Sequence, residues 1–157
     1  MTGVALTRDI GALLHRITGE IVQATAGGSG DNTEAISAYV DRTDYGSCKV
    51  LIEYTATMGA GETLTLAAGL KDATSSGGTG AAAFGTGLSA TVIATGPSPQ
   101  VAQTGCIELD YNLNGARQYI AATVTPNLSA SGTDTCVLGV SVVGGGNREN
   151  PVTARSN

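Results

Sequence analysis

Hydrophobic and polar positions alternate most regularly in the segment 105–125. Its first half places an apolar side chain at every second residue, which is the period of a strand with one buried face. These positions are Ile107, Leu109, Tyr111 and Leu113. Asn114 and Gly115 follow, a pair typical of a two-residue turn in which both residues have positive φ. The pattern therefore predicts an antiparallel hairpin. Its facing pairs would be Leu113 with Ala116, Tyr111 with Gln118, Leu109 with Ile120 and Ile107 with Ala122.

Strand-like runs separated by turns occupy most of the chain after residue 35. The positions expected to face the core are Ile36, Ala38 and Val40, then Cys48, Val50, Ile52 and Tyr54, then Leu64, Leu66, Ala68 and Leu70, and finally Cys136, Leu138, Val140 and Val142. Residues 88–94 resume strand character, whereas residues 73–88 have the composition of a long Gly-rich loop. Short strands at such intervals predict an all-β fold, an antiparallel β-sandwich of jelly-roll-like form.

The N-terminal part of the chain has a helical period instead. Its apolar residues recur on one face of a helix, and they are Leu6, Ile10, Leu13, Leu14 and Ile17. They predict a short helix or arm, which either covers one end of the sandwich or packs on a neighbouring subunit. In the second case these five residues are the candidate subunit or capsid interface.

Two further segments lack any periodic pattern. Residues 26–32 read Ala-Gly-Gly-Ser-Gly-Asp-Asn, which predicts a flexible hinge. The segment 144–157 is expected to be an irregular tail. The predicted organisation is therefore a helix or arm with a hinge over 1–32, a β-sandwich over 33–143 and a tail over 144–157.

Composition supports one globular domain and limits its partners. The chain has 157 residues, of which 23 are Gly and 13% are charged, and it contains no Trp. Its net charge of −5 argues against a nucleic-acid partner, because phosphate binding needs clustered Lys and Arg. No apolar run is long enough to cross a bilayer, and Asp9 stands where a signal peptide would be hydrophobic. We therefore expect a soluble product of the cytosol with no membrane partner.

The three cysteines are not spaced as metal ligands. Cys48, Cys106 and Cys136 each lie in a strand-like run, none is in a Cys-x-x-Cys pair, and the single histidine, His15, is far away in sequence. We expect buried free thiols, with one disulfide as the alternative.

Other possible chemical motifs are better explained as surface features. The spacing Gly78-x-Gly80-x-x-Ala83 matches a dinucleotide fingerprint without the strand and helix that give it meaning. Glu108 and Asp110 share one strand face, and such a carboxylate pair suits glycoside hydrolysis. Alternating charge on a wet face is the better explanation, because a sugar site would normally also offer aromatic platforms and the chain has no Trp. A calcium site would have to gather Asp31, Glu34, Asp41 and Asp44, whose spacing fits no known loop. We predict no catalytic residue, cofactor, metal ligand or small-molecule substrate.

Three runs of the chain carry a resemblance to a known class of proteins. They are Asp41–Tyr54, Gly61–Asp72 and Gly115–Thr125. In order and composition they resemble the head decoration or cement proteins of tailed bacteriophages, over roughly residues 35–143. The resemblance implies a non-enzymatic virion protein that binds the outside of a capsid, often as a homotrimer, and stabilises contacts between capsomers. Its partner would be the major capsid protein and its location the outer capsid surface, after synthesis in the host cytoplasm.

Other function classes stay open at this point. A receptor- or carbohydrate-binding β module is one, although the chain is poor in aromatic residues. A tail or connector structural protein is another, since the amphipathic N-terminal segment suits it. An enzyme would have to use the face of Glu108 and Asp110.

Overall fold

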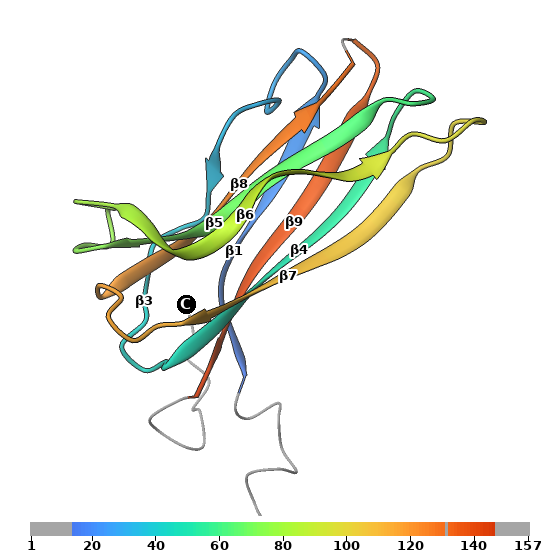
Figure 1. Ribbon diagram of the computed structural model, residues 1–157. Coiled ribbons are helices and arrows are strands. Elements are labelled where there is room, and N and C mark those ends of the chain that lie inside the picture. Colours follow the sequence, from blue (N-terminus) through green and yellow to red (C-terminus); the bar gives the residue numbers. More distant parts are fainter. Residues whose placement is uncertain (1–13, 131, 147–157) are drawn as a thin grey trace, which may run out of the picture.

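The described part of the protein is a sandwich of two antiparallel sheets (Figure 1). The computed structural model describes residues 14–130 and 132–146. Sheet I has the strand order β1-β9-β4-β7, and sheet II has the order β2-β8-β5-β6 with β3 also paired to β8. The strands are β1 (His15–Thr25), β2 (Ala35–Ile36), β3 (Val40–Asp41), β4 (Ser47–Thr57), β5 (Thr63–Ala73), β6 (Ala82–Thr95), β7 (Gln103–Asn112), β8 (Tyr119–Leu128) and β9 (Thr135–Gly145). The predicted all-β sandwich is confirmed.

The pairing of the strands is nested along the chain. β1 pairs with β9, β2 and β3 pair with β8, β4 pairs with β7, and β5 pairs with β6. Because β2 and β3 lie along the same partner strand, they act as two halves of one strand. Eight strands in two four-stranded sheets with this nested order form a jelly roll, which agrees with the predicted jelly-roll-like form.

The core lies between the two sheets and uses the predicted alternation. Val50 and Ile52 of β4, Leu64 and Leu66 of β5, and Leu138 of β9 are fully buried or nearly so. In β7 the alternation is also as predicted, since the side chains of odd-numbered residues face inward and those of even-numbered residues are exposed. The local period of β4, β5, β7 and β9 therefore identified the buried face of each of these strands. The prediction for residues 36–40 is wrong for Ile36, which is 39% exposed, and for Ala38, which is also exposed, whereas Val40 packs against the core and Ser37 is the buried residue.

The predicted hairpin over 105–125 is wrong. β7 pairs with β4 in sheet I, whereas β8 pairs with β5 in sheet II, so the chain crosses between the sheets after residue 112. Gly115 has a positive φ of 85° but Asn114 does not, and the N–H of Ala116 donates to the carbonyl of Leu113 at 3.1 Å. This is a single turn within a crossing loop. Two strands that face each other across a sandwich show the same inward alternation as two strands that pair, so the pattern alone could not choose between them.

The predicted helix is also wrong for its described residues. Residues 15–25 form β1, which pairs with β9 along its length with one irregularity between Arg16 and Thr18. The sandwich therefore extends beyond both predicted boundaries, with β1 before residue 33 and the end of β9 after residue 143.

The predicted hinge is a loop held by hydrogen bonds. The carboxylate of Asp31 accepts the N–H groups of Gly27 at 2.8 Å and Leu128 at 2.9 Å, and the N–H of Ala26 donates to the carbonyl of Asp134. The loop is therefore tied to both β8 and the segment that precedes β9.

The predicted Gly-rich loop over 73–88 is shorter in the structure. β6 begins at Ala82, and only residues 74–81 connect it to β5. Pairing with β5 supplies hydrogen bonds that override the weak strand preference of this composition.

The cysteines are free thiols, but only two of them are buried. Cys48 and Cys136 face the core, whereas Cys106 lies on the exposed face of β7. The expectation of a buried thiol is confirmed for the first two and wrong for Cys106, which occupies an outward position of the alternation.

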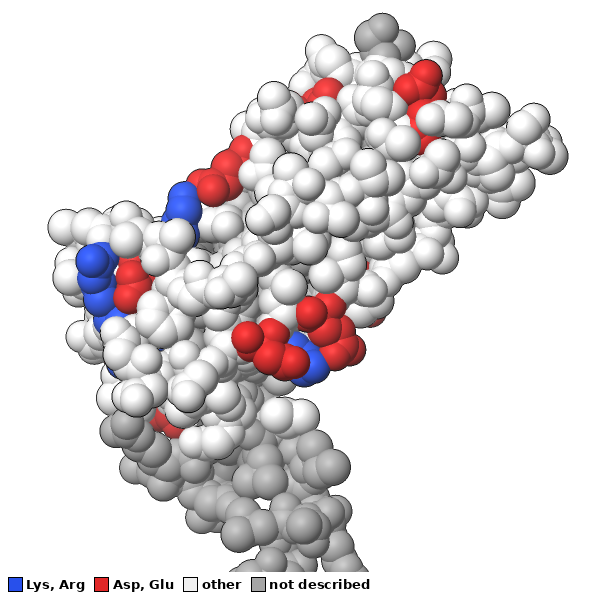
Figure 2. All heavy atoms as spheres, viewed as in Figure 1, with Lys and Arg blue, Asp and Glu red and all other residues white. Residues whose placement is uncertain are grey.

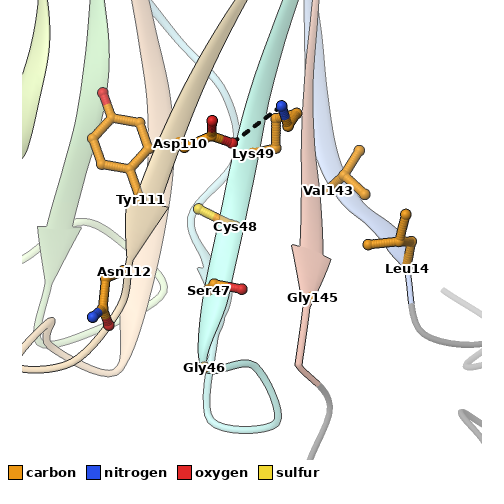
Figure 3. A pocket seen from close by; sticks show the side chains of 10 residues that line it. All are labelled: Leu14, Gly46, Ser47, Cys48, Lys49, Asp110, Tyr111, Asn112, Val143 and Gly145. Atoms are coloured by element: carbon orange, nitrogen blue, oxygen red, sulfur yellow. Dashed lines mark ion pairs between the residues drawn. The ribbon is translucent and has the colours of Figure 1, made fainter. Parts of the chain in front are cut away.

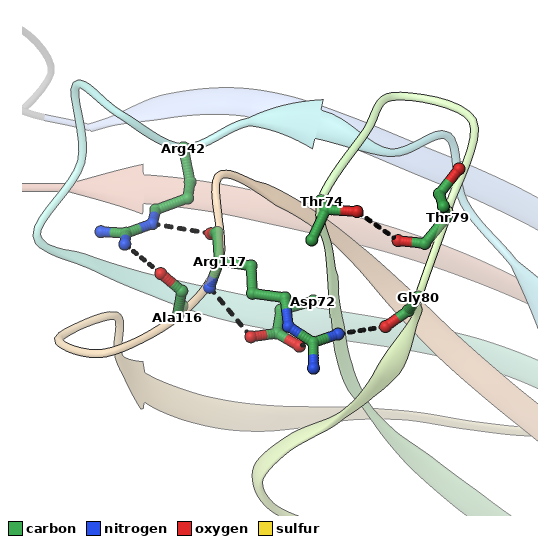
Figure 4. A network of polar contacts seen from close by, with 7 residues as sticks. All are labelled: Arg42, Asp72, Thr74, Thr79, Gly80, Ala116 and Arg117. Atoms are coloured by element: carbon green, nitrogen blue, oxygen red, sulfur yellow. Dashed lines mark hydrogen bonds and ion pairs between the residues drawn. The ribbon is translucent and has the colours of Figure 1, made fainter.

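Polar contacts hold the loop that crosses between the sheets (Figure 4). Asp72, at the end of β5, is only 6% exposed, and its carboxylate accepts the backbone N–H of Arg117 at 2.9 Å. The guanidinium of Arg117 donates to the carbonyl of Gly80, and that of Arg42 donates to the carbonyls of Ala116 and Arg117. The crossing loop is thus fixed to the β5–β6 turn and to the segment after β3.

None of the described residues forms a helix that could span a membrane.

Replacing the buried carboxylate of this network is expected to destabilise the fold. Asp72→Ala leaves the N–H of Arg117 without its acceptor, which should lower the free energy of unfolding by about 1–3 kcal/mol. The measurement is urea unfolding followed by far-ultraviolet circular dichroism. Asp110→Ala is the matched control, because this carboxylate is exposed and surface ion pairs contribute little. Equal destabilisation by the two substitutions would contradict the role given to Asp72.

Candidate functional site

An open groove lies on the outer face of sheet I, at the end where β1 begins and β9 ends (Figure 3). We call it the terminal groove, and it has a volume of about 570 Å³. Three lining residues, Lys49, Asp110 and Val143, lie side by side across the sheet. Lys49 pairs with Asp110 on one side and with Val143 on the other. The remaining lining residues are Leu14, Gly46, Ser47, Cys48, Tyr111, Asn112 and Gly145.

The structure separates the two predicted interface residues that it describes. Leu14 lies just before β1, is 48% exposed and lines the terminal groove. Ile17 is half-buried and packs against the core. Leu6, Ile10 and Leu13 lie outside the described residues. Of the predicted set, Leu14 is therefore the residue that the structure places on an open surface.

An ion cluster borders the terminal groove. The ammonium of Lys49 lies 2.5 Å from a carboxylate oxygen of Glu108 and 3.1 Å from one of Asp110. Hydrogen bonds to these two carboxylates raise the pKa of Lys49, because they stabilise its charged form. The two carboxylates considered above as an acid and base pair thus share one cation on an exposed surface.

The structure keeps most of the other candidate ligands apart. Asp31 accepts backbone N–H groups in its loop, and Glu34 pairs with Lys71. His15, Asp41 and Asp44 line a depression of about 200 Å³ beside β3. Within residues 14–130 and 132–146, no group of three or more His, Cys, Asp or Glu side chains has the arrangement of a metal site. Gly78 and Gly80 lie in the turn between two antiparallel strands, which is not the context of a dinucleotide fingerprint.

A second surface is defined by the absence of charge. The sequence contains no Asp, Glu, Lys, Arg or His between residues 73 and 107. The structure gathers much of this run at one side of the sandwich, where β6 is the edge strand of sheet II and lies beside β7. We call β6 and residues 96–102 the uncharged surface. Val92 and Val101 on it are 53% and 56% exposed.

The uncharged surface is visible as a broad white area between the coloured charges in Figure 2. Apart from Phe84 and Gln100, its side chains are small or aliphatic, and most positions of β6 are exposed. Residue types and strand period do not reveal this surface. The distribution of charge along the sequence would have revealed it, because a run of this length without a charged residue is unusual in a chain that is 13% charged.

Burial sets the chemistry of the thiols. Burial, followed by the nearby negative charge of Asp110, raises the pKa of Cys48 to about 12. Burial, followed by the charge of Asp31, raises the pKa of Cys136 to about 11. Both thiols therefore stay protonated near neutral pH, whereas Cys106 is open to solvent.

Comparison with known proteins gives no assignment of family. No family model and no curated protein matches the chain. Among solved structures, a chain described as "Structure of infectious bursal disease virus Gx strain" aligns with 13% sequence identity and a TM-score of 0.38. The alignment covers 88% of this chain and 33% of that chain, so this chain spans about a third of the length of the protein it matches. A TM-score of this size does not establish a common fold.

Thiol labelling is expected to distinguish the three cysteines. In the native chain at about pH 8, a thiol reagent should modify Cys106 alone, because the other two thiols are buried and protonated. After unfolding in guanidinium chloride, all three should react. With a reagent that releases a coloured thiolate, absorbance gives the number of reactive thiols per chain in the native and in the unfolded state. Cys106→Ser should abolish the reaction of the native chain. Rapid modification of a second thiol in the native chain would contradict the burial described here.

Proposed function

We propose that this chain is a non-enzymatic virion structural protein that binds the outer surface of a capsid and stabilises contacts between capsomers. In this role it acts as a decoration or cement protein, with the major capsid protein as its partner and a homotrimer as its working form. The proposal joins the resemblance carried by residues 41–54, 61–72 and 115–125 to the surfaces of the folded chain.

One observation carries the proposal. The apolar residues of the segment 6–17 are not all used by the core, because Leu14 exposes its side chain at the rim of the terminal groove. Leu6, Ile10 and Leu13 precede Leu14 in the sequence, so the apolar positions of this segment lead up to a residue that lines an open groove. An apolar segment beside a folded domain is suited to bind a neighbouring protein, since burial of its side chains against that protein is favourable.

The jelly roll is compatible with this role without proving it. The architecture occurs in viral capsid proteins and also in lectins, and a fold alone does not define a function. Several weak contacts made by an oligomer on a repeating shell would add up through avidity. Strong binding to an assembled capsid then needs no large contact from any single copy.

The test is sedimentation of the purified full-length chain with assembled shells of the virus that encodes it, and separately with its unassembled capsid subunits. The chain should sediment with the shells and remain in solution with the subunits. Ile10→Asp and Leu14→Asp should each weaken binding to the shells at least tenfold, because a charge would be buried in an apolar contact. Ile21→Asp is the control, since Ile21 is 71% exposed in the middle of β1, away from the terminal groove.

Three outcomes would overturn the proposal. One is failure of the unmodified chain to bind shells. Another is equal binding to shells and to free subunits. The third is equal weakening by Ile21→Asp and Leu14→Asp, which would remove the role of the N-terminal segment. Binding of a soluble glycan in place of shells would favour the carbohydrate-binding alternative.

A further inference from the structure

We infer that the uncharged surface, β6 with residues 96–102, is where copies of this chain contact one another. The inference deepens the proposed function, on which it rests for the expectation that several copies act together. It names the surface of the sandwich that lies nearest the symmetry axis of the oligomer.

The distribution of charge identifies a second copy as the partner. Around a symmetry axis, equivalent residues of the copies approach each other, so each charged residue there would meet its own sign. The whole chain carries a net charge of −5, which adds to the repulsion between copies at any acidic face. The uncharged surface contains no ionisable side chain, so two copies can meet there without like charges facing each other.

A surface that binds a charged partner would be expected to contain charged side chains. Recognition of a charged protein or nucleic acid relies on side chains of complementary sign. The uncharged surface offers none, and Val92 and Val101 are its large exposed apolar side chains. Depletion of charge with exposed aliphatic side chains is the composition found at the centre of protein interfaces.

The small side chains of β6 also keep the loss of conformational entropy on burial of this surface low. Positions 85–91 read Gly-Thr-Gly-Leu-Ser-Ala-Thr, and all except Leu88 are exposed. Gly and Ala lose no side-chain conformational entropy on burial, and Ser and Thr have only one rotatable side-chain bond between heavy atoms. Small side chains also allow another backbone to approach closely.

The contact is made by side chains, because β6 is poorly shaped to extend a sheet. Leu64 pairs with Ala94 and Asp72 pairs with Ala82, so nine residues of β5 lie against thirteen of β6. The four extra residues form irregularities along the strand, and such bulges interrupt the regular row of donors and acceptors that a further strand would need. The hydroxyl of Tyr54 also donates a hydrogen bond to the carbonyl of Ile93 at 3.0 Å.

The outer face of sheet I is the obvious competitor, and it differs in charge. It exposes Val137, which is 44% exposed, and also Ile21. The same face carries the exposed side chains of Glu53, Glu108 and Asp110, with Lys49 shared between the last two, so the acids outnumber this cation. Two copies meeting through this face would bring these acids together, so Val137 provides a control of matched residue type and similar exposure.

The experiment is the mass in solution of the full-length chain, measured by light scattering after size-exclusion chromatography at micromolar concentrations. The unmodified chain should have a mass that is a multiple of 15.6 kDa, and the oligomer should persist in molar salt because the contact contains no ion pairs. Val92→Asp and Val101→Asp should each reduce the mass to that of one chain. Val137→Asp should leave the oligomer intact. Circular dichroism verifies the fold of every variant, and these exposed positions tolerate a polar side chain.

Four results would overturn the inference. They are a monomeric unmodified chain, an oligomer that survives both Val92→Asp and Val101→Asp, dissociation by Val137→Asp to the same extent, and dissociation by salt. The measurement uses no shells, so it is independent of the proposed function. An oligomer that depends on Val92 in a chain that never binds shells would refute the capsid role alone. A monomer that binds shells would refute the contact between copies and the homotrimer, and would leave the binding to the capsid standing.

Discussion

Nested strand pairing is the constraint on which the rest of this structure depends. Among the strands that the structure describes, only β5 and β6 pair across a short turn, and every other pair joins a strand of the first half of the chain to one of the second half. Each sheet therefore contains strands from both halves, and the chain must repeatedly cross from one sheet to the other. The crossing loops carry backbone groups that no sheet can pair. The buried carboxylate of Asp72 accepts one such group, the N–H of Arg117, which explains an acid at a position where a sandwich core would otherwise be apolar. The half-buried carboxylate of Asp31 accepts another, the N–H of Gly27, and ties its loop to the N–H of Leu128 in β8.

How far the sequence predicts this fold follows from which interactions are local. The alternation in β4, β5, β7 and β9 identifies the buried face of each strand, because a side chain's direction depends only on its position in its own strand. The choice of partner is non-local. The runs on either side of Asn114 and Gly115 fit a hairpin in sequence, yet they belong to different sheets. At the N-terminus, the irregularity between Arg16 and Thr18 breaks the strand period, so the spacing of Leu14 and Ile17 matched a helix instead. The candidate site is predicted in part for the same reason. Leu14 was recognised as apolar, but its exposure depends on where β9 ends.

Part of the glycine content of the chain is explained by pairs of tyrosine rings and glycines. Four of the five tyrosines lie against a glycine whose Cβ atom would overlap the ring: Tyr39 at Gly78, Tyr45 at Gly144, Tyr54 at Gly105 and Tyr111 at Gly85. At Gly85 an added Cβ would lie 2.9 Å from Cδ1 of Tyr111, and the φ of 68° also favours glycine. Tyr111 belongs to sheet I and Gly85 to sheet II, so this pair fills the space between the sheets near β6 and β7. Four of the 23 glycines thus make room for an aromatic ring, and two of them, Gly78 and Gly85, lie in the Gly-rich run 73–88.

The distribution of charged side chains over the fold bears on how copies of the chain could assemble. Within residues 14–130 and 132–146, charged side chains lie on the outer face of sheet I, in the loops and near the ends of the strands, whereas β6 and its connection to β7 have none. In most proteins an edge strand is protected from other chains by charged residues. Here the irregularities of β6 prevent extension of the sheet, but nothing prevents packing of its side chains against another molecule. An edge protected in this way blocks open-ended strand addition and still allows a defined contact. That combination favours closed oligomers, because the acidic faces left outside the contact repel further copies.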